Sequence, residues 1–257
     1  MADFDPTIPS IARVYDYWLG GKDNFAVDRE LGEQLTSLIP STPVSLRENK
    51  KFLGLGVTWA ASQGIGQFID LGCGMPTSPS TQEMAQTVLP GARVACVDND
   101  PVVLSHLNAL PAGASTGMTV VDGDIRDTAA ILRAVAEGID LYQPACLMMG
   151  SLLHFFAAEE ARDLVARYTA ALVPGSCLIL TMGVASGEAA EQFRGLYSEG
   201  PSRLYLHSPD DFRSFFGPLE LLPPGIADAR ALRPGWAEVP GPTREAWMIA
   251  GIARVVG

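Results

Sequence analysis

The chain has 257 residues, 47% of them hydrophobic and 18% charged, a composition typical of a compact globular protein and not of a disordered chain. Its formal net charge of -11 argues against a nucleic-acid partner, because binding a phosphate backbone draws on clustered Lys and Arg. The longest apolar run, 145–158, is too short to span a bilayer and the acidic start lacks an export-signal pattern, so we expect a cytoplasmic protein with no membrane partner.

The first predicted element is a helix within IARVYDYWLGGKDNF (11–25). Its apolar side chains follow helical spacing, and Gly20-Gly21 form the usual stop. The apolar residues are Ile11, Val14, Tyr15, Trp18 and Leu19. We expect this face to dock on the core. The polar residues around the stop, such as Tyr17, Lys22 and Asn24, are expected to contact the cofactor or to close over the substrate. The segment is therefore predicted to be a lid that covers the ligand and excludes water.

Apolar runs typical of strands then alternate with helical patterns. The predicted strands cover 67–71, 92–98, 116–124, 144–150, 176–182, 219–222 and 246–255. Helices are predicted at 45–64, 81–89, 101–110, 128–137 and 157–172. This alternation predicts an α/β fold with a doubly wound, parallel sheet covered on both faces. The four cysteines form no CxxC pair and no cluster with histidine, so we expect neither a metal site nor a disulfide framework.

The stretch FIDLGCGMPTSPST (68–81) is the most informative about a ligand. A strand ends at Asp70, and Gly72 and Gly74 then form a tight turn into a helix, at the edge where doubly wound sheets bind ligands. A dinucleotide-binding fingerprint would need a third glycine at position 77, where this sequence has Thr77. An acid directly before the turn also suits a cationic ligand better than a pyrophosphate. S-adenosylmethionine, which carries an ammonium and a sulfonium, fits this pattern.

Two further strand ends carry acids. Asp98 ends the second strand, where a carboxylate can accept hydrogen bonds from two ribose hydroxyls. Asp122 and Asp124 follow the third strand, from which a carboxylate can accept the adenine amino group. A single acid at a strand end is more often a turn or cap residue. Acids at three successive strand ends, the first joined to GxG, favour a class I methyltransferase-type cofactor site.

The fourth strand runs into MMGSLLHFF (148–156), so backbone at Gly150 and Ser151 is expected to contact the methionine end of the cofactor. His154 lies just beyond, where a general base could remove a proton from a substrate hydroxyl or amine. It could equally cap the next turn or pack beside Phe155. On helix 45–64, Arg47 could hold a carboxylate bidentately or could simply be solvated.

Two regions lie outside the alternation of strands and helices. Residues 1–63 precede the first strand and are interpreted as a helical lid or cap. Residues 64–257 are interpreted as the methyltransferase domain, with a Pro- and Gly-rich insertion at about 183–244 on the substrate side. Long loops in compact domains are often binding lids.

Several motifs taken together resemble one family. SIARVYDYWLGGKDNFAVDRE, RENKKFL, GIGQFIDLGCGMPT, ARVACVDNDPVVL and LLHF occur in order, as in a family of actinobacterial S-adenosylmethionine-dependent methyltransferases formerly catalogued as a domain of unknown function. The resemblance implies a Rossmann-like class I fold with seven strands, the last pair antiparallel, and cofactor binding at the strand ends. It does not imply one substrate. This sequence departs from the family pattern at Cys73-Gly74-Met75 and at Gln82-Glu83.

The sequence thus predicts an S-adenosylmethionine-dependent methyltransferase acting on a small molecule, with specialised metabolism as its candidate setting. Two alternatives stay open: a protein of this fold that binds the cofactor for a non-methylating reaction, and a ligand-binding regulator. His154 is the candidate catalytic residue. The candidate cofactor-binding residues are Tyr17, Lys22, Asn24, Arg47, Asp70, Gly72, Cys73, Gly74, Asp98, Asn99, Asp124, Ile125, Gly150 and Ser151.

Overall fold

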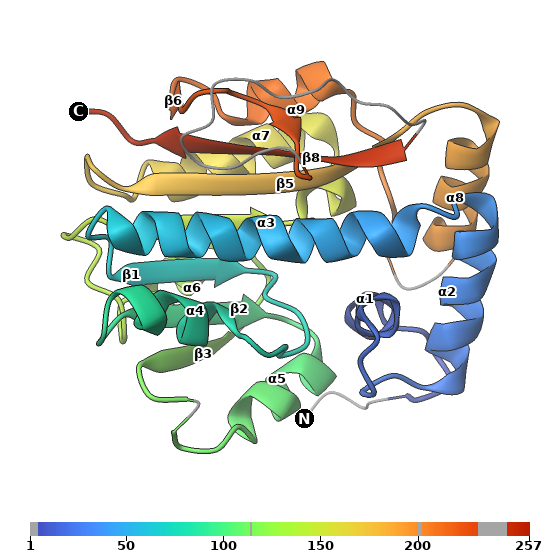
Figure 1. Ribbon diagram of the computed structural model, residues 1–257, viewed down its shortest axis with the longest axis horizontal. Helices are drawn as coiled ribbons and strands as arrows, with labels where there is room; N and C mark the ends of the chain where they lie inside the picture. The colour runs from blue at the N-terminus through green and yellow to red at the C-terminus, as the bar shows by residue number, and fades with distance from the viewer. Residues whose placement is uncertain (1–4, 114, 200–201, 231–245) are drawn as a thin grey trace.

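A single mixed sheet forms the centre of the molecule (Figure 1). The computed structural model describes residues 5–113, 115–199, 202–230 and 246–257. The sheet order is β3-β2-β1-β4-β5-β8-β6, with the short β7 paired to β8. The strands are β1 Gln67–Leu71, β2 Arg93–Asp98, β3 Met118–Asp122, β4 Cys146–Gly150, β5 Cys177–Ala185, β6 Glu220–Leu221, β7 Ala227–Asp228 and β8 Ala246–Arg254.

Strands β1 to β5 are parallel, and β8 runs antiparallel to both β5 and β6. The predicted doubly wound sheet with an antiparallel last pair is therefore confirmed. All seven predicted strands are present, whereas β7 was missed because two residues are too few to show a pattern. The strand order reverses between β1 and β4, which makes their carboxyl ends the expected ligand-binding point of such a sheet.

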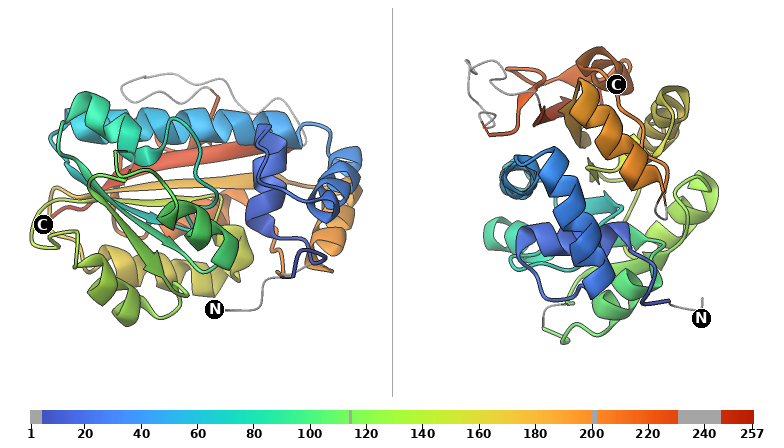
Figure 2. Two further views of the ribbon diagram at one scale, coloured as in Figure 1. Left: turned by 90° about the horizontal axis from the view of Figure 1, so that it is seen from below. Right: turned by 90° about the vertical axis from the view of Figure 1, so that its right-hand side faces the viewer.

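Helices cover both faces of the sheet (Figures 1 and 2). They are α1 Ile11–Leu19, α2 Ala26–Leu38, α3 Thr42–Ser62, α4 Thr81–Val88, α5 Pro101–Asn108, α6 Thr128–Val135, α7 Ala158–Thr169, α8 Glu188–Ser198 and α9 Pro209–Phe215. The long α3 lies along one face together with α4 and α5, while α6, α7 and α9 cover the other. The helices predicted between strands are confirmed. Sequence reasoning did not predict α2, α8 and α9.

Alternating side chains of the parallel strands feed two separate cores. Phe68 of β1 points to the face that α3 covers, where Phe52 and Val57 are fully buried. Its neighbour Ile69 points to the opposite face and packs in the cluster that contains Leu164 of α7. Burial on both faces explains why these strands are nearly continuous apolar runs.

The N-terminal helices lie beyond the carboxyl ends of the parallel strands, beside α8 (Figure 1). Figure 2 shows the same arrangement from below. The hydrophobic cluster of the α3 face includes Val14 of α1, Phe52 of α3 and Ile252 of β8, so α1 and α3 share the core of the sheet. The division into a lid at 1–63 and a domain at 64–257 stays a prediction.

The late insertion supplies α8, α9 and the two short strands β6 and β7. Its Pro- and Gly-rich part from 231 to 244 lies outside the described residues. Within the part of the chain that the structure describes, no helix has both the length and the hydrophobicity that a membrane span requires.

Candidate functional site

The loop after β1 is shaped by two glycines with left-handed backbones. Gly72 and Gly74 both have φ of 67°, a conformation that side chains rarely adopt. A Cβ on Gly72 would also come within 2.7 Å of Leu152 Cδ1, whereas the space beside Gly74 is open. The amides of Gly72 and Cys73 both donate to the Val97 carbonyl, which fixes the loop against β2. The loop therefore leaves an open backbone surface at Gly74.

Asp70 lies at the base of this loop, with Thr81 Oγ1 donating to its Oδ2 at 3.0 Å. Burial raises the pKa of Asp70 to about 6, although the charge of Lys50 opposes the shift. Burial in turn lowers the pKa of Lys50, and Asp70 is the main charge that opposes it. Lys50 belongs to α3, so the structure adds a basic residue that sequence reasoning did not assign. The pair places a carboxylate and an ammonium at the end of β1.

Asp98 ties the end of β2 to the glycine loop. Its carboxylate accepts hydrogen bonds from the backbone amides of Gly74 at 2.9 Å, Asn99 at 2.9 Å and Asp100 at 3.0 Å. Burial raises its pKa, and these backbone donors partly offset that shift. The structure thus brings Asp70 and Asp98 together around one loop. It also shows that Asp98 stabilises its own turn, which was the alternative interpretation of a strand-end acid.

Asp124 is more exposed than the other two acids. Arg126 donates to it through its backbone amide at 2.9 Å and through Nη1 at 3.1 Å. Ile125, which follows Asp124 in the chain, is buried, and its carbonyl accepts a hydrogen bond from the Tyr168 hydroxyl.

Cys73 lies in the loop after β1, where its thiol contacts Cys96. The hydrogen bond between the two thiols raises the pKa of Cys73 well above its usual value. The assigned cofactor contacts of Asp124, Ile125, Cys73 and Asn99 stay predictions.

A polar network connects the end of β4 to the N-terminal helices. Asn49 Nδ2 lies 2.9 Å from both the Tyr15 hydroxyl and Ser151 Oγ, and burial raises the pKa of Tyr15 to about 12. Ser151 has a left-handed φ of 52°, and its amide bonds to Thr181. A Cβ on Gly150 would approach Leu53 Cδ1 to 2.7 Å. The turn at Gly150 and Ser151 is therefore held in a strained backbone conformation directly at the end of β4.

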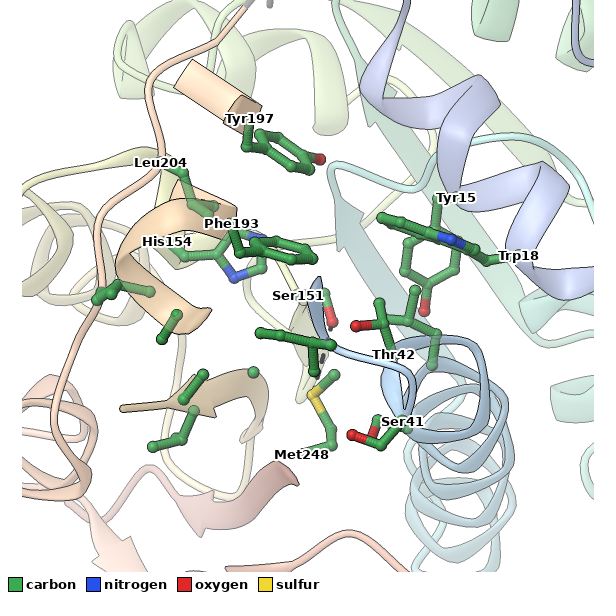
Figure 3. Close-up of a pocket in the computed structure, with 18 of the residues that line it drawn as sticks. Tyr15, Trp18, Ser41, Thr42, Ser151, His154, Phe193, Tyr197, Leu204 and Met248 are labelled. Carbon is green, nitrogen blue, oxygen red and sulfur yellow. Dashed lines mark hydrogen bonds between the residues drawn. The ribbon is translucent and has the colours of Figure 1, made fainter. Parts of the chain in front are cut away.

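A cavity opens beside this network, between α1, the start of α3, β5 and α8 (Figure 3). Its volume is about 130 Å³. Tyr15 and Trp18 of α1 line one side, and Phe193 and Tyr197 of α8 line another. Among the described residues that line it, none is Asp, Glu, Lys or Arg. The cavity is therefore a largely apolar space adjoining the carboxyl end of β4.

His154 is part of the cavity wall, in the short 3-10 helix η1 Leu153–Phe155. Its ring lies edge-on to Phe155, with ring centroids 4.5 Å apart. Burial lowers the pKa of His154 to about 4, and His207 adds to that effect. The imidazole is consequently neutral near pH 7, so it can accept a proton or a hydrogen bond. His207 is held by the carbonyls of Leu153 and Phe156, a structural role.

The polar residues of the N-terminal region that the sequence predicts to bind the cofactor do not line this cavity. The Tyr17 hydroxyl contacts Glu33 at 3.2 Å, Asn24 Nδ2 donates to Asp16 at 2.8 Å, and Lys22 is exposed. Arg47 donates to the Trp18 carbonyl at 3.2 Å. The cavity is instead lined by Tyr15 and Trp18, which sequence reasoning had placed on the docking face. A cofactor contact by Tyr17, Lys22, Asn24 or Arg47 stays a prediction that these contacts do not support.

Three features of the described residues fit a bound S-adenosylmethionine. The space beside Gly74 is open, in a position that a side chain would fill. Two buried polar atoms, Thr77 Oγ1 in the glycine loop and Asn49 Oδ1 beside Ser151, have no hydrogen-bond partner in the described structure. Such atoms are costly unless a ligand or water satisfies them. They lie at the loop and at the β4 end, where a cofactor extended across the sheet would need donors and acceptors.

This strand order, with a GxG loop after β1 and an antiparallel last strand pair, defines a class I methyltransferase fold. The chain belongs to the S-adenosyl methyltransferase family, whose model matches residues 1–256. It is 38% identical to a candidate methyltransferase from Thermobifida fusca, with a TM-score of 0.90 and coverage of 98% of this chain and 96% of that one. The resemblance stated from the sequence is thereby confirmed.

Two other solved structures extend this comparison. A DUF574 family protein from Streptomyces avermitilis is 33% identical, with a TM-score of 0.89 over 97% of this chain and 98% of that chain. Human N-acetylserotonin methyltransferase, solved with S-adenosylmethionine, is 14% identical with a TM-score of 0.51 over 95% of this chain and 62% of its own. The latter similarity shows the fold alone. A search of curated proteins found no match.

Proposed function

We propose that the protein transfers a methyl group from S-adenosylmethionine to a small molecule, in the cytoplasm and in specialised metabolism. The observation that carries this proposal is the position of the cavity. It adjoins Ser151 at the end of β4, next to the end of β1, where Asp70 lies and the loop with Gly74 begins. The four unpaired cysteines fit a reducing compartment.

The chain's own residues divide into two groups around that position. Asp70 and the open Gly74 backbone would hold the cofactor, with Asp98 as acceptor for its ribose. A bound S-adenosylmethionine supplies an electrophilic methyl group on a positively charged sulfur. Tyr15 and Trp18 of α1 line one side of the cavity, where they would help to exclude water during the reaction. Because methyl transfer depends chiefly on alignment, the main task of this wall is to position the acceptor.

Calorimetry with S-adenosylhomocysteine tests the cofactor assignment. We expect one binding site per chain and no binding of NAD, because the loop has the acid before GxG and lacks the third glycine at Thr77. Incubation with methyl-labelled S-adenosylmethionine and a cell extract should then label a small molecule. Saturable NAD binding without a response to S-adenosylhomocysteine would exclude the proposed function. Cofactor binding without any methyl-labelled product would favour a non-methylating reaction.

Asp70 should make cofactor affinity depend on pH. Its pKa of about 6 in the free protein means that it becomes protonated as the pH falls through that value, and a neutral carboxyl no longer attracts an ammonium group. We expect affinity for S-adenosylhomocysteine to fall by up to about tenfold per pH unit below this point, as linkage requires. Calorimetry across this range measures the slope. Asp70→Asn should bind more weakly and lose the dependence, whereas a flat profile for the native chain would contradict the assignment.

His154 should remain neutral over the physiological range. Because burial lowers its pKa to about 4, the folded protein should protonate this ring only as the pH falls through that value. The unfolded chain protonates it near its ordinary value of about 6.5, so this histidine makes folding less favourable as the pH falls between the two values. NMR titration of its Cε1–H signal, assigned with His154→Gln, measures the midpoint. A midpoint near the ordinary histidine value would contradict the buried, neutral imidazole.

A further inference from the structure

We infer that the cavity binds an uncharged aromatic compound that carries a hydroxyl group, and that this hydroxyl is the methyl acceptor. The inference rests on the proposed function and specifies its substrate class. It depends on three properties of the cavity wall: an aromatic side, a side lined by hydroxyl groups, and the absence of charged side chains among the described lining residues.

The aromatic side is built from three rings on two elements. Tyr197 of α8 stacks with Phe193 at a centroid distance of 5.9 Å and with Phe155 of η1 at 6.1 Å. Figure 3 shows Phe193 and Tyr197 facing Trp18 and Tyr15 of α1 across the cavity. Aromatic pairs gain about 0.5 to 1.5 kcal/mol beyond the burial of their area. A flat aromatic ligand inserted between α1 and α8 would bring its faces against rings on both sides.

The part of the wall at the start of α3 offers hydrogen bonds without charge. Ser41, Thr42 and Ser45, at the start of α3, line the cavity with hydroxyl groups, and Ser151 adds another. The single titratable imidazole, His154, is kept neutral by burial. A carboxylate, phosphate or ammonium placed here would be removed from water without an ionic partner from the wall, at a cost of several kcal/mol. Neutral oxygen-bearing ligands face no such penalty.

The size of the cavity agrees with a ligand of one or two rings. Its volume of about 130 Å³ is close to the roughly 150 Å³ of an engineered apolar cavity that binds benzene. A macromolecular acceptor would need an extended groove, whereas the described lining residues surround a local space between α1, α3 and α8. The wall therefore favours a small aromatic molecule.

His154 identifies the reacting group of that molecule. No hydrogen bond to its ring nitrogens occurs within the described structure, although the ring lines the cavity, so an acceptor nitrogen is free for a ligand hydroxyl. When the hydroxyl oxygen forms its bond to the methyl carbon, the carbon–sulfur bond breaks with its electron pair left on sulfur. The hydroxyl proton then passes to the imidazole. A buried base of low pKa is adequate here, because the proton becomes strongly acidic as the new bond forms.

Binding of three probes to the protein saturated with S-adenosylhomocysteine tests the inference. We expect 2-naphthol to bind at one site, naphthalene to bind about five- to tenfold more weakly for want of one hydrogen bond, and 2-naphthoate to bind at least about a hundredfold more weakly because its charge is unpaired. Calorimetry measures all three. If 2-naphthoate binds as tightly as 2-naphthol, or 2-naphthol does not bind, the inference is wrong. Lack of S-adenosylhomocysteine binding would instead refute the proposed function.

Variants of the wall separate recognition from general destabilisation. Phe193→Ala should weaken 2-naphthol binding by about tenfold or more, since it removes a ring from the stack. Tyr142→Ala removes an aromatic ring that is 88% exposed and outside the cavity, and should change nothing. His154→Phe should reduce 2-naphthol to the affinity of naphthalene. Equal losses in Phe193→Ala and Tyr142→Ala, or an unchanged preference for 2-naphthol in His154→Phe, would overturn the assignment.

Discussion

Asp98→Ala is expected to weaken S-adenosylhomocysteine binding by about 2 to 4 kcal/mol, roughly 30- to 1,000-fold. The carboxylate holds the Gly74 amide at 2.9 Å and anchors the turn at Asn99 and Asp100. Its loss removes a charged acceptor for the ribose hydroxyls and also releases the glycine loop from the end of β2. Both effects act on the cofactor site, so calorimetry should record a loss of affinity that exceeds any change in unfolding free energy.

Asp163→Ala provides a matched control for this prediction. Asp163 lies on α7, is exposed, and pairs with Arg167 of the same helix at 3.2 Å. We expect its variant to bind S-adenosylhomocysteine like the native chain. Equal affinity in the two variants would mean that Asp98 is only a turn residue. In that case the ribose acceptor must be another carboxylate at the end of β2, such as Asp100.

The fold could be predicted because its signals are local. Residues 67–71 and 92–98 are apolar runs long enough to show burial on both faces, and each ends at an acid followed by a turn. By contrast, β7 contains two residues, and its pairing with β8 depends on contacts distant in sequence. Such a short element shows no periodicity.

The cofactor loop was predictable for the same reason, while the cavity was not. Gly72 and Gly74 indicate a positive φ because both belong to one short motif, and the structure has this conformation at both. The cavity instead needs α1 to meet η1 and α8, both of which come more than a hundred residues later in the chain. Spacing assigned Tyr15 and Trp18 to the buried face of α1, and both do pack against the core cluster. It could not show that the same side chains also line a cavity.

Lys50 illustrates a second limit of sequence reasoning. It follows Arg47 in the motif RENKKFL, where any polar residue of a helix could be solvated. The long helix α3 runs along the sheet, so that the charge of Lys50 lies near Asp70 at the end of β1. Only the packing direction of α3 distinguishes Lys50 from the exposed Arg47.

Arg13→Met is expected to lower the free energy of unfolding by about 3 to 5 kcal/mol, the usual cost of breaking a buried ion pair on one side. Arg13 Nε lies 2.8 Å from Asp28 Oδ2, with both side chains almost inaccessible to solvent. The same carboxylate accepts the backbone amides of Ser10 and Phe25. The variant leaves this carboxylate buried without its cation, and urea unfolding measures the effect.

The loss should be concentrated where α1 docks on α2, and thus at the wall that Tyr15 and Trp18 provide. Protease cleavage near Gly20-Gly21 should therefore become faster, because α1 opens more often. Arg29→Met is the matched control: Arg29 is exposed and bonds only to Asn24 in the described contacts, so we expect a change within about 0.5 kcal/mol. If both variants lose the same stability, the buried pair does not hold the helix in place, and the apolar contacts of Val14 and Trp18 alone must fix the wall of the cavity.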